Sequence, residues 1–498
     1  MSVDEIDRDQ LEQFAEAGAQ VPASLLLAVL IRLEAAEAEL ASLKLNSRTS
    51  SKPPSSDRHN PNKPGKNKNE NERGRQKKDK KDKKKRKPGG QKGRTGKTLN
   101  QVSNPDHVVN HALDRRRGKC THCNASLRGV KVTGFEVRQV HDLPEKIRTE
   151  VSEHRAETAQ CACCGKKVKA AFPDEVRAAA PYGPRLKSLV VYLQTYQLLP
   201  CERISEFMGD VFDCALSAGT ICSMVKSVGD RAGPTYQAIK TELLKALYIH
   251  CDETGLSVNG STHWLHTAST PELVYLHIDA SRGEDALHTM DILPDYKGRV
   301  VHDYLSVYYT LDGLEHSLCN AHHLRDLTCV HEDYGQAWAG AMIDLLLEAK
   351  RLKDRERRGG RIVGPKTIER LLKRYCELLD EGFDLNPEPA RKPGARGRVK
   401  RGKPLNLLLR FDERFEEVLA FLLEDNVPFD NNEAERDLRM MKVKQKISGC
   451  FRSFSQSQAF AQLRSIIATA KKRSLNILEI LSIIVKEPQD AQKILLTS

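Results

Sequence analysis

The sequence predicts a multidomain α+β protein. Three observations carry this prediction: the net charge lies in one short segment, two CxxC pairs lie in the first third of the chain, and strand-like runs alternate with helical runs beyond residue 246. A chain of 498 residues is long for one domain, and a hydrophobic fraction of 39% suffices for several cores. We expect seven consecutive segments along the chain.

Residues 1–46 are predicted to form a helix that joins two copies of the chain. Apolar side chains recur at alternating steps of three and four residues, which is typical of a coiled-coil seam. The seam covers less than three heptads, so packing against the body of the same chain is the alternative. The seam positions are Leu26, Val29, Leu33, Ala36, Leu40 and Leu43.

Residues 47–100 are predicted to be a disordered basic linker that contacts nucleic acid. Residues 61–100 hold 17 Lys and Arg against 4 Asp and Glu, an excess that equals the net charge of +13 of the whole chain. The segment has no aromatic residue and almost no apolar one, so it cannot bury a core. A basic run of this kind is attracted to polyanions, and a purely solubilising linker is the alternative.

Residues 101–180 are predicted to be a zinc-ribbon-like module. Two CxxC knuckles supply four thiolates, which is the ligand set of a tetrahedral structural zinc ion. The stretch between the knuckles, 135–158, alternates apolar and polar residues and is predicted to form strands. A set of unrelated free thiols is the alternative, and His122 and His154 are left out of the site. The predicted zinc ligands are Cys120, Cys123, Cys161 and Cys164.

Residues 181–245 carry apolar side chains at helical spacing and are predicted to be a helical region. Pro184 suits the start of a helix, and Ser217 or Ala218 begins another. Two helices joined by a short turn could form a helix-turn-helix that binds DNA. Plain helical packing explains the pattern equally well.

Residues 246–327 change to a pattern of strands. Three alternating runs with short turns predict an antiparallel meander, which a helix at 283–293 and a strand ending at Asp303 then follow. This order matches a ribonuclease-H-like α/β layout. In that layout a carboxylate in the first strand, Asp252, faces one at the end of the fourth, Asp303. A strand end with one solvated face is the alternative for Asp252.

The third carboxylate is predicted in residues 427–498, which we expect to form the C-terminal helices of the catalytic core. Polar residues 430–432 suit a helix start with capping side chains. Glu435 follows within that helix, and its neighbour at helical spacing is Arg439. Periodicity does not choose between Glu433 and Glu435, and a surface Glu–Arg pair is the alternative. The predicted buried stripe is Ala434, Leu438 and Met441.

Residues 328–426 read as helices around a basic linker at 391–404. They separate the second predicted carboxylate from the third. We interpret them as a helical insertion that could track DNA.

Several motifs in this order resemble the transposases of the insertion sequence 66 family, which are DDE transposases. The motifs are "LNSRTSSKPPSSD", "RKPGGQKGRTGKTL", the cysteine module, "YGPRLKSLVVYL", "HCDETGLSVNGSTHWLH", "VHDYLSVYY", "CNAHHLRDL" and "DNNEAERDLR".

The resemblance implies a ribonuclease-H-like catalytic domain, DNA as substrate and Mg²⁺ (or Mn²⁺) as cofactor. It also implies that Asp252, Asp303 and Glu435 form the catalytic and metal-binding triad. Cys319 and His322 fit the Cys-x-x-His signature of many such enzymes and receive a structural or accessory role. Arg436, next to the third acid, and Arg439 are accessory candidates for contacts with DNA.

These expectations describe a transposase that binds the ends of an insertion sequence, hydrolyses phosphodiester bonds and transfers the freed strand into target DNA. A zinc-ribbon regulator without catalysis and a simple metal-dependent nuclease are the alternatives. Expected partners are double-stranded DNA, further copies of the chain and helper proteins of the same element. The apolar run 21–31 is too short to span a bilayer, and 13 scattered cysteines suit a reducing cytoplasm, with nucleoid association on DNA.

Overall fold

The computed structural model describes residues 99–173, 176, 181–389 and 399–497. The predicted N-terminal helix and almost all of the basic linker lie outside the described residues. The chain divides into two compact units, one formed by Pro64–Arg148 and the other mainly by Thr149–Ser498.

The described part of the smaller unit, residues 99–148, contains no helix or multi-residue strand. The strands predicted between the knuckles are therefore wrong for residues 135–157. Alternation alone does not make a strand when no neighbour covers its apolar side, and Val140 is 90% exposed. The strands near the second knuckle, β1 (Thr158–Gln160) and β2 (Lys167–Lys169), form an antiparallel pair in the larger unit.

Three helical segments precede the main sheet, as the sequence predicts for this region. They are α3 (Pro184–Val191), α4 (Cys201–Phe212) and α5 (Ala218–Leu243), with a π-helical turn at Tyr192–Tyr196. The predicted helix starts are confirmed. Pro184 occupies the first turn of α3, and the Ser217 hydroxyl caps α5 by accepting the N–H of Thr220 at 3.0 Å.

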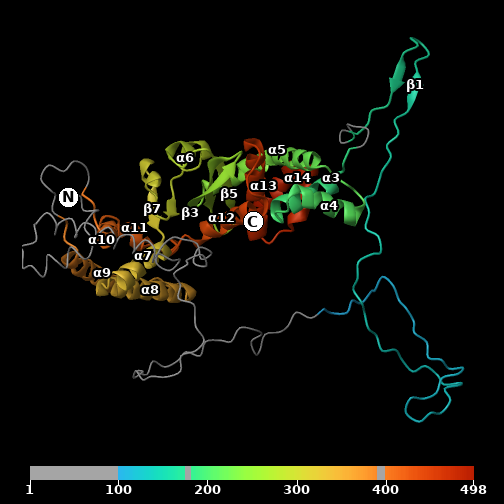
Figure 1. Ribbon diagram of the computed structural model, residues 1–498, viewed down its shortest axis with the longest axis horizontal. Coiled ribbons are helices and arrows are strands. Elements are labelled where there is room, and N and C mark those ends of the chain that lie inside the picture. The colour runs from blue at the N-terminus through green and yellow to red at the C-terminus, as the bar shows by residue number, and fades with distance from the viewer. Residues whose placement is uncertain (1–98, 174–175, 177–180, 390–398, 498) are drawn as a thin grey trace, which may run out of the picture. The chain divides into compact units, whose positions relative to one another are not determined.

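A five-stranded sheet forms the centre of the larger unit (Figure 1). Its strands are β3 (Tyr248–Val258), β4 (Ser261–Ser269), β5 (Val274–Asp279), β6 (Arg299–His302) and β7 (Glu315–Leu318). The spatial order is β5-β4-β3-β6-β7, with β3, β4 and β5 antiparallel and both β6 and β7 parallel to their neighbours. Helix α6 (Glu284–Met290) connects β5 to β6. The predicted meander, helix and fourth strand are confirmed, whereas β7 was not predicted.

The two faces of β3 pack against different helices because successive side chains of a strand point to opposite sides. Cys251 joins a core with α5 and the C-terminal helices α14 (Ile477–Lys486) and α15 (Pro488–Leu496). Leu256, an even-numbered position, joins a separate core with Leu438 of α12 (Asn432–Ser448). The predicted buried stripe of α12 is confirmed, since Ala434, Leu438 and Met441 are all buried.

Helix α13 (Phe454–Lys472) runs along the free edge of β5. Its hydroxyl side chains accept backbone hydrogen bonds from that strand: Ser465 Oγ from Leu276 at 2.9 Å, and Thr469 Oγ1 from Val274 at 3.0 Å. The edge strand is thereby covered and its donors are satisfied.

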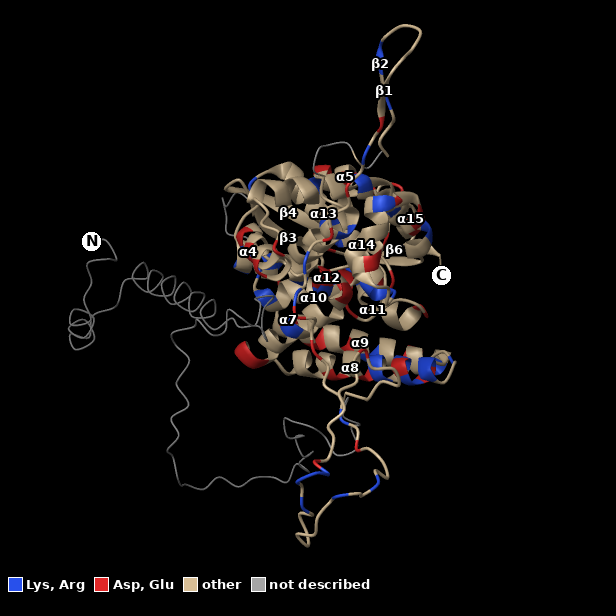
Figure 2. Cartoon of the chain, turned by 90° about the vertical axis from the view of Figure 1, so that its right-hand side faces the viewer, with Lys and Arg blue, Asp and Glu red and all other residues tan. Residues whose placement is uncertain are grey.

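The predicted helices between the second and third carboxylates are confirmed, although residues 390–398 of their basic linker lie outside the described residues. The helices are α7 (Asn320–Asp333), α8 (Ala337–Arg358), α9 (Pro365–Leu385), α10 (Lys403–Glu413) and α11 (Phe415–Leu423). They enclose a core that includes Trp338, Tyr375, Phe411 and Phe421. Lys and Arg residues, interspersed with acidic ones, lie towards one end of the α8–α9 pair, where the last turn of α8 is basic (Figure 2).

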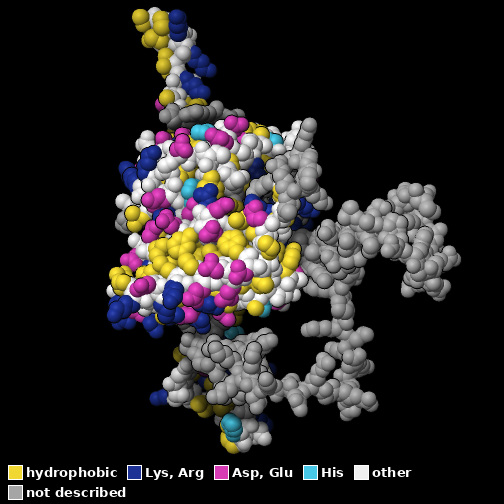
Figure 3. Space-filling view, turned by 90° about the vertical axis from the view of Figure 1, so that its left-hand side faces the viewer, with side chains coloured by type: hydrophobic (Ala, Val, Ile, Leu, Met, Phe, Trp, Pro, Cys, Tyr) yellow, Lys and Arg dark blue, Asp and Glu magenta, His cyan; other side chains and the backbone are white. Residues whose placement is uncertain are grey.

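An apolar surface pocket opens at the start of α9. It is lined by Ile362, Val363, Pro365, Ile368, Leu372 and Cys376, together with two charged residues. Figure 3 shows a band of hydrophobic side chains on this side of the molecule.

Among the helices of the described residues, none has both the length and the apolar character that crossing a membrane requires.

Candidate active site

The register of β3 and β6 brings the first two predicted carboxylates together. The strands are parallel, with Tyr248 beside Arg299 and His250 beside Val301. Continuing this register by two residues places Asp252 beside Asp303, which directly follows the last residue of β6. This extended register, together with the effect of the Asp303 charge on Asp252, is consistent with two neighbouring acids.

Asp252 and its neighbour Glu253 point to opposite faces of β3 and have different surroundings. Glu253 is buried and accepts hydrogen bonds from Arg282 at 2.6 Å and from the Tyr308 hydroxyl at 3.1 Å. Asp252 shares its face with Leu256, on the side of α12. Glu253 therefore acts within a structural hydrogen-bond network, and Asp252 is free to face the third acid.

The pKa of Asp252 is unusually high for an aspartate. Burial, followed by the nearby charges of Glu253 and Asp303, raises the pKa of Asp252 from 3.8 to about 8. The charge of Glu435 also acts on Asp252 in the same direction. A cluster of buried carboxylates that repel each other is stabilised by protons or by a cation.

Asn431 fastens the start of α12 to β3. Its side-chain oxygen lies 2.9 Å from His250 Nδ1, and its amide nitrogen donates to the Cys251 carbonyl at 2.7 Å. Its backbone N–H donates to Cys319 Sγ at 3.1 Å. Asn431 is the residue before the helix, yet its side chain makes no capping bond. The predicted capping role is wrong for Asn431 because its amide is used across to the sheet instead.

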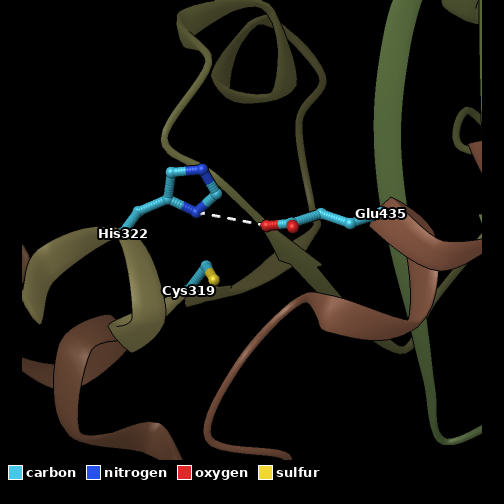
Figure 4. Close-up of side chains that lie close together, drawn as sticks. All are labelled: Cys319, His322 and Glu435. Carbon is cyan, nitrogen blue, oxygen red and sulfur yellow. Dashed lines mark ion pairs between the residues drawn. The ribbon is translucent and has the colours of Figure 1, made fainter. Parts of the chain in front are cut away.

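Glu435 lies one turn into α12 and faces the first turns of α7 (Figure 4). Its Oε1 atom is 3.8 Å from His322 Nδ1 and 3.9 Å from a guanidinium nitrogen of Arg325. Glu433 has a different environment, since it pairs with Lys472 at 3.0 Å and with Arg436. Burial alone would raise the pKa of Glu433, but Lys472 and Arg436 together outweigh it and lower that pKa.

Three polar atoms around this point are buried and have no hydrogen-bond partner: Asp303 Oδ1, His322 Nδ1 and Glu435 Oε1. The ligand atoms of Cys319, His322 and Glu435 lie within 4.8 Å of one another, which is a spacing that could hold a metal ion. Burial raises the pKa of the Cys319 thiol to about 12. Burial, with the charge of Arg325, lowers the pKa of His322 and favours its neutral form.

Comparison with known proteins identifies the chain's family. The sequence model described as "Transposase IS66 family" matches residues 180–459, more than half of the chain. The chain belongs to the IS66 family of transposases. None of the curated proteins compared with it matches. As an IS66 transposase the protein is an enzyme of transposition, and its substrate is DNA.

The matched residues of this transposase contain Asp252, Asp303, Glu435 and the Cys319–His322 pair, but neither cysteine knuckle. Sequence reasoning missed Arg325 and the anchoring role of Asn431. The spacing Cys319, His322, Arg325 could have shown Arg325, because residues three apart share a helix face. Asn431 gave no comparable signal, since its partners lie on a distant strand.

The accessory arginines of the IS66 transposase form no ion pair with Glu435 in the described part of the chain. Arg436 is exposed and pairs with Glu433. Arg439 is also exposed, and the basic side chains within 4.0 Å of Glu435 in the described part of the chain are His322 and Arg325. Glu435 therefore contacts His322 and Arg325 of α7, and the expected pairing with Arg439 is not observed in the described part of the chain.

The two cysteine knuckles of the IS66 transposase have the same backbone turn. The N–H of Cys120 donates to Ala125 and the N–H of Asn124 donates back to Cys120; Cys161 exchanges the same pair of bonds with Lys166 and Gly165. Backbone N–H groups directed at the sulfur lower the pKa values of both Cys120 and Cys161. The knuckles belong to different units, so a shared zinc ion stays a prediction.

Proposed function

We propose that this IS66 transposase cuts the ends of its element and transfers them into target DNA with a DDE triad of Asp252, Asp303 and Glu435. The observation that carries the proposal is the parallel register of β3 and β6, which supports Asp252 and Asp303 as neighbours when it is continued by two residues. Glu435, fixed one turn beyond Asn431, acts electrostatically on Asp252. This effect supports Glu435 as the third acid, although the ligand atoms that lie within 4.8 Å of one another in the described residues are those of Cys319, His322 and Glu435.

We further propose that residues 246–327 and 427–498 build a ribonuclease-H-like core, interrupted by the helical insertion 328–426. The sheet order β5-β4-β3-β6-β7 and its mixture of antiparallel and parallel pairs support this assignment. The separate apolar core of α7 to α11 supports an insertion that packs within itself.

The carboxylate cluster suits divalent cations, and Mg²⁺ or Mn²⁺ is the proposed cofactor. Oxygen ligands from acidic side chains are those that Mg²⁺ prefers, and the raised pKa of Asp252, caused by burial and by neighbouring acids, supports a preference of the cluster for added positive charge. When bound, such ions stabilise the attacking and leaving oxygens of a phosphodiester during in-line displacement. Asp252, Asp303 and Glu435 would hold them.

The reaction needs no covalent protein intermediate. Water attacks the phosphodiester at the end of the element and frees a 3′-hydroxyl, which then attacks a phosphodiester of target DNA. Arg325, which lies 3.9 Å from Glu435 and is partly exposed, is placed to donate hydrogen bonds to a phosphate at this site. The basic end of the α8–α9 pair offers further phosphate contacts outside the cluster.

We also propose that Cys120, Cys123, Cys161 and Cys164 hold one zinc ion. The matching turns and the N–H groups directed at two of the sulfurs support this assignment, because such turns favour the thiolate form that binds zinc. The basic linker would add affinity for DNA of any sequence.

We also propose that the chain binds further copies of itself and helper proteins of the same element. The exposed apolar surface at the start of α9 supports an interaction surface there.

A strand-transfer assay with DNA that carries the ends of the element tests the proposal. The wild-type protein should produce nicked ends and joined products in Mg²⁺, and Asp252→Asn or Asp303→Asn should bind the DNA but produce neither. Cleavage without joined products would identify a simple nuclease. Full activity of both variants would contradict the triad and leave a regulator that binds DNA as the better explanation.

A further inference from the structure

The unpartnered nitrogen of His322 belongs to the carboxylate cluster. His322 Nδ1, Asp303 Oδ1 and Glu435 Oε1 are each buried without a hydrogen-bond partner. The charges of Asp303 and Glu435 both act on His322, and Glu435 Oε1 is the nearer of the two at 3.8 Å from His322 Nδ1, within the group that it forms with Cys319. Leaving a buried polar group unpaired costs about 1–3 kcal/mol, and an absent ion is a common explanation.

The distance between His322 Nδ1 and Glu435 Oε1 fits two ligands of one ion better than a direct hydrogen bond. At 3.8 Å it exceeds the usual hydrogen-bond range. Two atoms bound at about 2.1 Å to one ion lie about 3 to about 4.2 Å apart, depending on the angle between the bonds. Figure 4 shows the imidazole ring and the carboxylate turned towards each other from α7 and α12.

Cys319 lies close to both groups but has another partner. Its sulfur accepts the backbone N–H of Asn431 at 3.1 Å and is almost completely buried. That bond holds the residue before α12, so the sulfur supports the helix that carries Glu435. We therefore assign Cys319 a positioning role and His322 a direct one.

We propose that His322 Nδ1 and Glu435 Oε1 are ligands of one divalent ion at the carboxylate cluster, and that the site consequently selects Mn²⁺ over Mg²⁺. Mg²⁺ prefers an all-oxygen shell, whereas an imidazole ligand favours metals later in the divalent series. This inference rests on the proposed function, because it takes the carboxylate cluster as the metal site. It adds the nitrogen ligand and the preference that this ligand imposes.

The test is Mn²⁺ binding to the full-length, zinc-loaded protein without DNA, followed by electron paramagnetic resonance. Bound Mn²⁺ in the wild-type protein should show coupling to an imidazole nitrogen, and its affinity should exceed that of Mg²⁺. His322→Gln should lose the coupling and bind Mn²⁺ about tenfold or more weakly. His288→Gln, an exposed histidine on α6, is the matched control and should behave as wild type.

A second variant separates loss of the ligand from loss of the fold. His322→Asp supplies an oxygen in place of the nitrogen, so it should keep a bound ion, show no nitrogen coupling and shift its preference towards Mg²⁺. Circular dichroism should show the wild-type helix content in both variants.

Two results would overturn the inference while sparing the triad. One is wild-type Mn²⁺ without nitrogen coupling, although Glu435→Gln abolishes binding; the other is a larger loss of Mn²⁺ affinity in Cys319→Ser than in His322→Gln. If the proposed function itself is wrong, the carboxylate cluster is not the metal site, and Asp252→Asn and Glu435→Gln would both bind Mn²⁺ with wild-type affinity.

Discussion

The side-chain amide of Asn431 donates a 2.7 Å hydrogen bond to the backbone carbonyl of Cys251. This bond joins the residue before α12 to the residue before Asp252. It therefore fixes the distance between the helix that carries Glu435 and the strand that carries the first acid. The second bond of the same amide, to His250, prevents its rotation.

Asn431→Ala should destabilise the protein and lower the rate of DNA cleavage. Removing a buried amide leaves the Cys251 carbonyl and His250 without a partner, which costs about 1–3 kcal/mol of unfolding free energy. Urea denaturation measures this loss, and cleavage at saturating Mg²⁺ measures the rate. Asn432→Ala is the control, because the Asn432 side chain makes no hydrogen bond in the described part of the chain. Equal effects of both changes would refute the anchoring role.

His302 should control the turn that aims Asp303. His302 Nδ1 accepts the N–H of Tyr304 at 3.2 Å, and Tyr304 has a φ of 76°, which is strained for a residue with a side chain. In His302→Asn, the side-chain oxygen can still accept this bond, whereas in His302→Leu it is lost. We expect the Leu variant to need more Mg²⁺ for half-maximal cleavage than the Asn variant. Identical Mg²⁺ dependence in the two would show that this bond does not orient Asp303.

The stability of the metal-free protein should fall as the pH rises from about 4, the unfolded pKa of Asp252, to about 8, its folded pKa. The pKa of Asp252 is about 8 in the folded chain, against 3.8 for an ordinary Asp. The folded state therefore keeps a proton that the unfolded state has already lost, and this advantage disappears as the pH rises through the folded pKa. A divalent ion replaces the proton, so stabilisation by Mg²⁺ should grow over the same pH range.

Thermal melting in EDTA and in Mg²⁺ measures both trends. Asp252→Asn should flatten the metal-free pH dependence, and Asp384→Asn, at an exposed position on α9, should leave it unchanged. A pH dependence in Asp252→Asn as steep as in the wild type would assign the effect to another group.

The zinc content of the protein should depend on Cys161 and not on its neighbour Cys163. Cys161 begins the second knuckle turn and has backbone N–H groups directed at its sulfur, whereas Cys163 is exposed between the two predicted ligands. Cys161→Ser should lower the zinc content of the purified, reduced protein to well below one equivalent, and Cys163→Ser should keep it. Metal analysis decides this, and equal zinc in both variants would contradict the four-cysteine site.

The sequence predicted the elements of the larger unit better than their connections. The runs of alternating residues that became β3, β4 and β5 were long enough to recognise, but β7 has only four residues and no clear alternation. The strands expected at 135–157 did not form, and in the described part of the chain Val140 and Val151 have no second surface against them, since they are 90% and 91% exposed. Alternation indicates a strand only where a second surface exists.

The acidic residues of the candidate site were proposed from the sequence, but the side chains that surround them were not. The order of strands and helix in the sequence matched a ribonuclease-H-like layout, and that layout led to the prediction that Asp252 faces Asp303. The different surroundings of Glu433 and Glu435 depend on Lys472 of α13 and His322 of α7, which are remote in sequence. Helical periodicity carries no information about such partners, so it could not choose between the two glutamates.

The most direct test of the triad compares Glu435→Gln with Glu433→Gln in a cleavage assay on element-end DNA. Both changes remove one negative charge from the first turn of α12, but Glu433 serves an ion pair with Lys472 and Glu435 serves the carboxylate cluster. We predict that Glu435→Gln binds DNA and cuts none of it in Mg²⁺, while Glu433→Gln retains most of its activity. Near-normal cleavage by Glu435→Gln would contradict the assignment, and an inactive Glu433→Gln beside it would transfer the role to Glu433.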